Sequence, residues 1–183
     1  MPVTARMQPT QVPDICARAR AFAAAMHGGQ RRKYSDKPYV VHLDAVVSIL
    51  RSFGITAPPV LAAAYLHDTV EDTEATIQDI YVSFGEQIAE LVYWLTDAEQ
   101  GGRRMRKMMS AWRLGHAPWD AKMIKLADLI DNTEQICRKD PDFAPVYLRE
   151  KRKIVEKMVE AEGERLTTLP LFKEASRIMD LPR

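Results

Sequence analysis

Cysteine is scarce in this sequence of 183 residues, which contains only Cys16 and Cys137. The two lie far apart, and neither belongs to a C-x-x-C pair or to a spacing typical of a zinc ribbon. This excludes a disulfide-dense scaffold and a cysteine-based metal site. Two separate thiols are typical of proteins in a reducing cytosol, so we expect a cytoplasmic protein.

Long hydrophobic runs and an excess of one charge are also missing. The longest apolar run, residues 60–66, is far too short to span a bilayer, and no N-terminal segment has the pattern of a signal peptide. The formal net charge is +1, so the chain has no global field that would attract nucleic acid or an anionic membrane. We therefore expect neither of these as a partner, and any recognition of charge must be local.

The sequence does have strong helical periodicity. Ile88, Leu91, Val92 and Leu95 recur at the spacing of one helix face. Several glycines and prolines, among them Gly28, Pro38, Gly101 and Pro141, fall between the periodic segments. The pattern predicts an all-α bundle of about eight to nine helices in a single domain, residues 1–183. The predicted helices cover residues 12–27, 40–54, 58–70, 76–83, 85–97, 104–115, 118–138, 142–164 and 169–179.

Four ionisable side chains follow one of the apolar segments, in the stretch LHDTVEDT. They are His67, Asp68, Glu71 and Asp72. On a continuous helix, each of the first two would lie one turn from one of the last two, at a C-terminal end where the helix dipole disfavours carboxylates. Either this is a solvated, frayed helix end, or a bound divalent cation compensates the charges.

Two further segments place polar residues among apolar ones. His42 lies within PYVVHLDAV, and Asp128 lies within MIKLADLIDN together with Lys125 and Asn132. Taken singly, such residues are usually structural, as a hydrogen-bonded histidine or a paired aspartate. Together with the histidine and aspartate of the HD pair, they supply two imidazoles and two carboxylates from three helices. This donor set suits Mn²⁺ or Fe²⁺ with positions left open for water and substrate.

The order H…HD…D resembles the HD-domain metal-dependent phosphohydrolases. The segments HGGQRRKYSDKPYVVH, AAAYLHDTVEDT, FGEQIAELVYWLTD and KLADLIDN are similar to the hydrolase domain of the RelA/SpoT family, in particular to its small, stand-alone alarmone hydrolases. The similarity covers residues 17–160. It implies an HD-type helical bundle and leads us to expect a hydrolase without a synthetase domain.

The resemblance assigns roles to particular residues. It implies that four ligands hold the metal, typically manganese, and that two carboxylates activate the attacking water and contact the pyrophosphate. It further implies substrate contacts from a basic pair, a tyrosine and an asparagine. The residues are His42, His67, Asp68 and Asp128 as ligands, Glu71 and Asp72 as catalytic carboxylates, and Arg32, Lys33, Tyr39 and Asn132 at the substrate.

The reaction implied by the resemblance is metal-dependent 3′-pyrophosphohydrolysis of (p)ppGpp, which yields GDP or GTP and pyrophosphate. A guanosine with two pyrophosphate groups calls for local cations. Besides the basic pair, the candidates are Lys125, Arg103 and Arg104, the last two within the basic cluster RRMRK at residues 103–107. An exposed basic helix start explains this cluster equally well.

The sequence departs from the family pattern at several positions. Leu43 stands where the family usually has proline, and Leu129 and Asp131 stand where it has a basic residue and then an aromatic residue or histidine. Asp131 would weaken binding of an anion if it faced the pocket, and would do nothing if it faced solvent. A later family arginine is matched by either Arg149 or Arg152.

Other functions stay open at this point. The same metal site would serve a phosphatase acting on NADPH or another nucleotide, or an antitoxin that removes an alarmone. A non-catalytic alarmone-binding protein would not need Glu71 and Asp72. A homodimer is also open, because the amphipathic stretch YLREKRKIVEKMVEAEGERL suits either a partner helix or a solvated outer helix.

Overall fold

The computed structural model describes residues 14–97 and 101–180. Within these ranges the chain forms eleven helices and one isolated β-bridge, so the all-α prediction is confirmed. The helices are α1 (Ile15–Met26), α2 (Val40–Ser52), α3 (Pro58–Leu66), α4 (Thr69–Asp72), α5 (Ile77–Phe84), α6 (Glu86–Leu95), α7 (Arg103–His116), α8 (Trp119–Lys139), α9 (Ala144–Glu162), α10 (Glu164–Thr167) and α11 (Pro170–Ile178).

The two helices beyond the predicted nine, α4 and α10, have four residues each. α4 arises because the helix predicted over residues 58–70 is broken at the HD pair. The His67 ring hydrogen-bonds through Nδ1 to the Ala64 carbonyl oxygen at 2.8 Å. In a continuing helix, this oxygen would accept the hydrogen bond of the backbone amide four residues later. Glu71 and Asp72 therefore lie on a separate turn, and their predicted position at the C-terminal end of a longer helix is wrong.

The longest apolar run of the sequence forms α3. Pro58 occupies its first position, where the fixed backbone angle of proline suits a helix start. Every residue from Val60 to Leu66 is buried, so this helix is covered on all sides. Among the described residues, none of the helices is long and apolar enough to cross a membrane.

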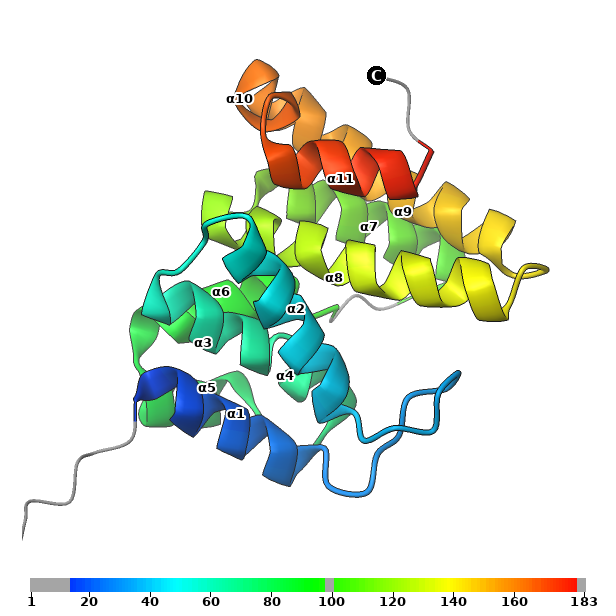
Figure 1. Ribbon diagram of the computed structural model, residues 1–183. Helices are drawn as coiled ribbons and strands as arrows, with labels where there is room; N and C mark the ends of the chain where they lie inside the picture. Colours follow the sequence, from blue (N-terminus) through cyan, green and yellow to red (C-terminus); the bar gives the residue numbers. More distant parts are fainter. Residues whose placement is uncertain (1–13, 98–100, 181–183) are drawn as a thin grey trace, which may run out of the picture.

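α8 crosses the middle of the bundle, between α1 and α5 at the bottom of Figure 1 and α10 and α11 at its top. It packs against α2, α3 and α6, which come from the N-terminal half of the chain, and against α9 and α11, which come from the C-terminal half of the chain. Its residues 121–124 and 126–130 are buried. A polar side chain on this helix, such as Asp128, is consequently carried into the interior.

α9 packs mainly against α7. Ile154, Val155 and Met158 of α9 are buried, so its apolar face is used within the chain. Gly115 of α7 allows a close approach: a Cβ added there would lie 2.9 Å from the Lys157 Cβ and 3.0 Å from the Lys157 carbonyl oxygen. The absence of a side chain at this position therefore sets how near the two helices lie.

We expect Gly115→Ala to lower the free energy of unfolding by about 1–3 kcal/mol, because the added methyl group would push α7 and α9 apart. Gly102→Ala is the control, since an added Cβ there meets no described atom within 4 Å and the φ angle is −68°. It should cost less than the test variant. Urea unfolding followed by circular dichroism measures both, and a Gly115→Ala protein as stable as the wild type would contradict the close contact.

Candidate active site

Two histidines and two aspartates meet in the core. His42 from α2, His67 after α3 and Asp128 from α8 are all buried, and Asp68 follows His67. The His67 Nε2 atom lies 3.1 Å from Asp68 Oδ2 and 3.7 Å from Asp128 Oδ1. The His42 Nε2 atom lies 3.4 Å and 3.3 Å from the same two oxygens. The structure thus brings together the four side chains that the sequence predicted as metal ligands.

The hydrogen bonds of the two imidazoles leave one nitrogen of each ring for a cation. His67 Nδ1 faces the Ala64 carbonyl oxygen, and His42 Nδ1 faces Asp131 Oδ2 at 2.7 Å, so the acceptors place the ring proton on Nδ1. Both Nε2 atoms are buried and have no hydrogen-bond partner among the described residues. Donor atoms of His42, His67 and Asp128 lie within 4.8 Å of one another, which fits a divalent cation.

Protons and a cation compete for these nitrogens. Burial lowers the pKa of His67, but the carboxylates of Asp68 and Asp128 outweigh it and raise the pKa to about 9. Burial acts in the same direction on His42, and the carboxylates around it raise its pKa well above the usual value. In the cation-free protein the imidazoles are therefore held as cations that neutralise the buried aspartates. A metal must displace these protons.

Polar neighbours hold the two central carboxylates in place. The Tyr39 hydroxyl donates to Asp68 Oδ2 at 2.6 Å, and Asn132 Nδ2 donates to Asp128 Oδ1 at 2.5 Å. Lys125 Nζ lies 2.7 Å from Asp128 Oδ2. Three residues predicted to contact the substrate thus contact the predicted metal ligands.

Glu71 and Asp72 lie beside this cluster and remain exposed to solvent. The Asp97 amide donates to Glu71 Oε2 at 3.0 Å, which ties α4 to the end of α6. Desolvation of the carboxylate end raises the pKa of Glu71, and desolvation together with the charge of Asp68 raises that of Asp72. A raised pKa makes each carboxylate a better proton acceptor.

A cavity of about 530 Å³, here called the substrate cavity, opens beside the cluster. Glu71 and Asn132 line it, and Asn132 connects it to the cluster through Asp128. Positive charge dominates its walls, because five cationic side chains face three carboxylates, those of Glu71, Asp97 and Glu150. The cations are Lys33, Arg103, Arg106, Lys107 and Lys151, and three aromatic rings, Tyr34, Phe143 and Tyr147, complete the walls with Ile136.

Four predicted substrate contacts are not among the described residues that line this cavity: Tyr39 and Lys125, which contact the predicted metal ligands, and Arg32 and Arg104. Arg32 is buried, and its guanidinium donates to Asp131 and, over 3.0 Å, to Asn132 Oδ1. Arg104 is exposed and is not among the described residues that line the substrate cavity. Arg103 does line it, although it also pairs with Glu150 at 2.9 Å.

The model of the HD domain family matches residues 19–158 of the sequence. The chain belongs to the HD-domain family. The guanosine-3′,5′-bis(diphosphate) 3′-pyrophosphohydrolases MESH1 of Xenopus tropicalis and Homo sapiens are each 40% identical to it over 126 residues, 68% of this chain and 70% of theirs. The structure of a metazoan ortholog of SpoT that hydrolyzes ppGpp matches with a TM-score of 0.81 at 30% identity, over 93% of this chain and 97% of that one. The resemblance to the alarmone hydrolases and the HD-type fold are thereby confirmed.

Asp131 is the site residue of this HD-domain protein for which the sequence led to the wrong alternatives. It neither repels an anion in the substrate cavity nor faces solvent without a role, because its Oδ2 accepts hydrogen bonds from His42 and Arg32. Its position one turn after Asp128 on a buried helix was the available signal. The sequence could not say which side chains would meet it.

His27 was not singled out from the sequence. It is buried, its ring stacks on Tyr39 with centroids 4.5 Å apart, and its Nδ1 lies 2.5 Å from Gln30 Oε1. Its place three residues before Gln30 in HGGQ was the only signal. Through Tyr39, it supports the hydroxyl that contacts Asp68.

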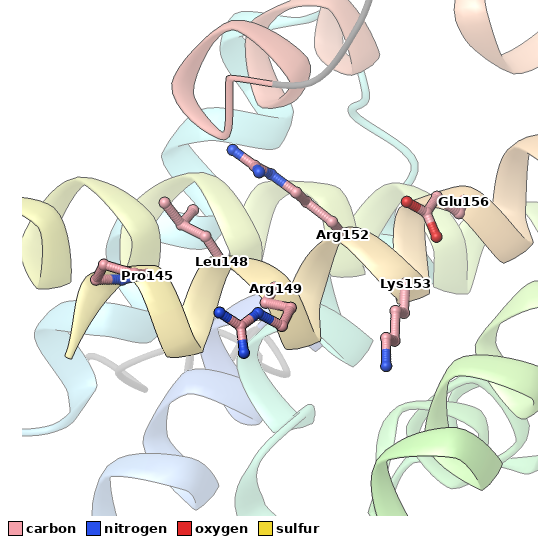
Figure 2. A pocket seen from close by; sticks show the side chains of 6 residues that line it. All are labelled: Pro145, Leu148, Arg149, Arg152, Lys153 and Glu156. Carbon is pink, nitrogen blue, oxygen red and sulfur yellow. The ribbon is translucent and has the colours of Figure 1, made fainter.

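Neither Arg149 nor Arg152, the two matches for the later family arginine, lines the substrate cavity. Both line a hollow of about 450 Å³ along α9 and point to opposite sides of that helix (Figure 2). Arg152 donates to the Met179 carbonyl oxygen at 2.8 Å and 3.1 Å. The cation of this segment that lines the substrate cavity of the HD domain is Lys151, which lies there with Tyr147 and Glu150. Burial and the charge of Lys125 lower the pKa of Lys151 to about 8.

We expect Mn²⁺ binding to release protons and to weaken as the pH falls. With a pKa of about 9 in the cation-free protein, His67 carries a proton over most of the neutral range, and lower pH makes that proton harder to displace. Calorimetric titrations in two buffers of different ionisation enthalpy count the released protons. His67→Ala should lose Mn²⁺ binding. An affinity that does not change with pH would contradict the assignment of the imidazoles.

Proposed function

We propose that this protein is a manganese-dependent guanosine-3′,5′-bis(diphosphate) 3′-pyrophosphohydrolase that converts (p)ppGpp to GDP or GTP and pyrophosphate. One observation carries the proposal: a cavity lined by five cations, three aromatic rings and the Glu71 carboxylate lies beside a cluster of two histidines and two aspartates. Its volume falls within the usual range for small-molecule sites. The activity named for the MESH1 relatives supports the same substrate.

In this proposal His42, His67, Asp68 and Asp128 hold the cation. When bound, the cation supplies Lewis acidity, which lowers the pKa of the attacking water and neutralises charge on the phosphoryl oxygens. Tyr39 and Lys125 keep the ligand carboxylates in place by their contacts with them.

Glu71 or Asp72 accepts the proton of the attacking water and holds the water in line with the 3′ phosphorus. The hydrogen bond from the Asp97 amide orients Glu71 for this task. The raised pKa of both carboxylates brings them nearer to the pH at which a general base works best.

The charges of the two pyrophosphate groups meet the cations of the substrate cavity. Arg103 and Arg106 suit bidentate contacts with phosphate, whereas Lys33, Lys107 and Lys151 act as point charges. The aromatic rings offer surfaces on which a guanine base can stack. Asn132 contacts the nucleotide from the end of the cavity that borders the cluster, while Arg32 acts indirectly through Asp131.

We also propose that residues 1–183 form one cytoplasmic domain. One hydrophobic cluster draws on helices from α1 to α11, and both cysteines are free thiols, as expected in a reducing compartment. Because the apolar face of α9 packs within the chain, we do not propose a homodimer through that helix.

Incubation of the purified protein with ppGpp and Mn²⁺ should yield GDP and pyrophosphate, and EDTA should stop the reaction. Chromatography of the nucleotides and a pyrophosphate assay measure the products. NADPH in a parallel reaction tests the phosphatase alternative. If Mn²⁺ binds but ppGpp stays intact, the protein either acts on another nucleotide or senses the alarmone without cleaving it, and the proposal is wrong.

The double variant Glu71→Gln with Asp72→Asn should retain Mn²⁺ binding while kcat falls by about 10²- to 10⁴-fold, because positioned proton acceptors are lost and the ligands are not. Single-turnover kinetics and metal titration separate the two effects. Glu74→Gln removes an exposed carboxylate from the same segment and is the matched control. A double variant with nearly wild-type kcat would rule out these residues as the water-activating groups.

A further inference from the structure

Asp131 is the acceptor on which a predicted metal ligand and a buried arginine converge. Its Oδ2 atom lies 2.7 Å from His42 Nδ1 and also accepts from Arg32 Nη1. The side chains of His42 and Arg32 are 1% and 8% exposed, and that of Asp131 is 21% exposed. Charge-assisted hydrogen bonds in so closed a site are strong and directional, so they determine where the His42 ring points.

The two histidines of the cluster are oriented by different acceptors. His67 Nδ1 faces the neutral carbonyl oxygen of Ala64, which belongs to the same turn of the chain. His42 Nδ1 faces a carboxylate that comes from α8, 89 residues further along. A carboxylate partner fixes the tautomer and also increases the basicity of the other ring nitrogen, which is the one that faces the cluster.

Arg32 and Asn132 continue a chain of hydrogen bonds from this contact to Asp128. Arg32 Nη2 donates to Asn132 Oδ1 at 3.0 Å, and Asn132 Nδ2 donates to Asp128 Oδ1 at 2.5 Å. Both terminal nitrogens of Arg32 are thus engaged within this chain, and Arg32 is not among the described residues that line the substrate cavity. Its contacts are with the residues that support the ligands.

We propose that Asp131 is a positioning residue that orients His42 toward the divalent cation, with Arg32 as the counter-charge that keeps the carboxylate in place. The inference rests on the proposed cation site and is independent of which nucleotide is cleaved. An aspartate stands here where the family resemblance leads one to expect an aromatic residue or histidine, so the contact is a property of this sequence.

The test compares Mn²⁺ affinity among full-length variants by electron paramagnetic resonance of the free ion, without nucleotide. Asp131→Asn should bind Mn²⁺ about 10- to 100-fold more weakly, as is typical when the partner of a ligating histidine is altered. Arg32→Gln leaves the bond between Asp131 and His42 and should lose clearly less. Equal losses of Mn²⁺ affinity in the two variants would overturn the proposal, because Asp131 would then act only as the partner of Arg32. An unchanged affinity in Asp131→Asn would also overturn it.

Asp140→Asn is the matched control. Like Asp131, Asp140 accepts a side-chain hydrogen bond, here from the Tyr34 hydroxyl at 2.6 Å, and pairs with a cation, Lys33. Its described contacts include none of the predicted metal ligands. The Asp140→Asn variant should bind Mn²⁺ with the affinity of the wild type. A loss of affinity as large as that of Asp131→Asn would overturn the proposal. If Asp131→Asn does not fold, as judged by circular dichroism, Asp131→Ser takes its place in the same comparison.

The imidazole signals provide a second readout that general damage would not reproduce. The chain has four histidines, so nitrogen NMR of the cation-free protein can resolve His42 and His67. Asp131→Asn should shift the ring signals of His42 and leave those of His67, whose acceptor is a backbone carbonyl, unchanged. A shift in both rings or in neither would overturn the proposal. Because no nucleotide is used, failure of the ppGpp reaction and failure of this inference are distinguishable.

Discussion

Asp68 and Asp128 place negative charge inside a helical bundle, and the surrounding residues are arranged around that charge. An ionised carboxylate in an apolar interior is costly unless opposite charge and hydrogen bonds compensate it. Two imidazoles, the Lys125 ammonium and the Tyr39 hydroxyl provide this compensation. A divalent cation would provide it more fully, which is why the same residues suit both a stable core and a metal centre.

The local backbone follows from the same cluster. α3 is apolar and its residues 60–66 are buried, so burial alone would favour a longer helix. The chain turns at the HD pair, where the His67 ring hydrogen-bonds through Nδ1 to a carbonyl oxygen of α3 and its Nε2 faces the aspartates. The break separates Glu71 from α3 and places its carboxylate within reach of the Asp97 amide. A single histidine thus serves as a helix terminator and as a predicted ligand.

Charge is strongly organised in a protein whose formal net charge is only +1. The cluster is rich in carboxylates and attracts cations, whereas the adjoining substrate cavity has five cationic side chains and attracts anions. Glu71 and Asn132 lie where the two regions meet. A phosphorylated nucleotide would place its reacting group at this boundary, with metal on one side and charge-neutralising side chains on the other.

The sequence by itself determined the helices and the polar residues of the core. Periodicity depends on local burial, so nine predicted segments correspond to nine of the helices, and His42 and Asp128 stood out because they are polar within apolar faces.

Only the tertiary structure decided which side chains meet. Asp131 and Arg32 are 99 residues apart. Neither their pairing nor the contact of Asp131 with His42 can be recognised from the periodicity of the sequence. Lys151 likewise reaches the substrate cavity, while Arg149 and Arg152 do not, because the rotation of α9 against α7 is set by packing at positions such as Gly115. Such contacts depend on distances between helices that are remote in the chain, and local sequence patterns carry no measure of those distances.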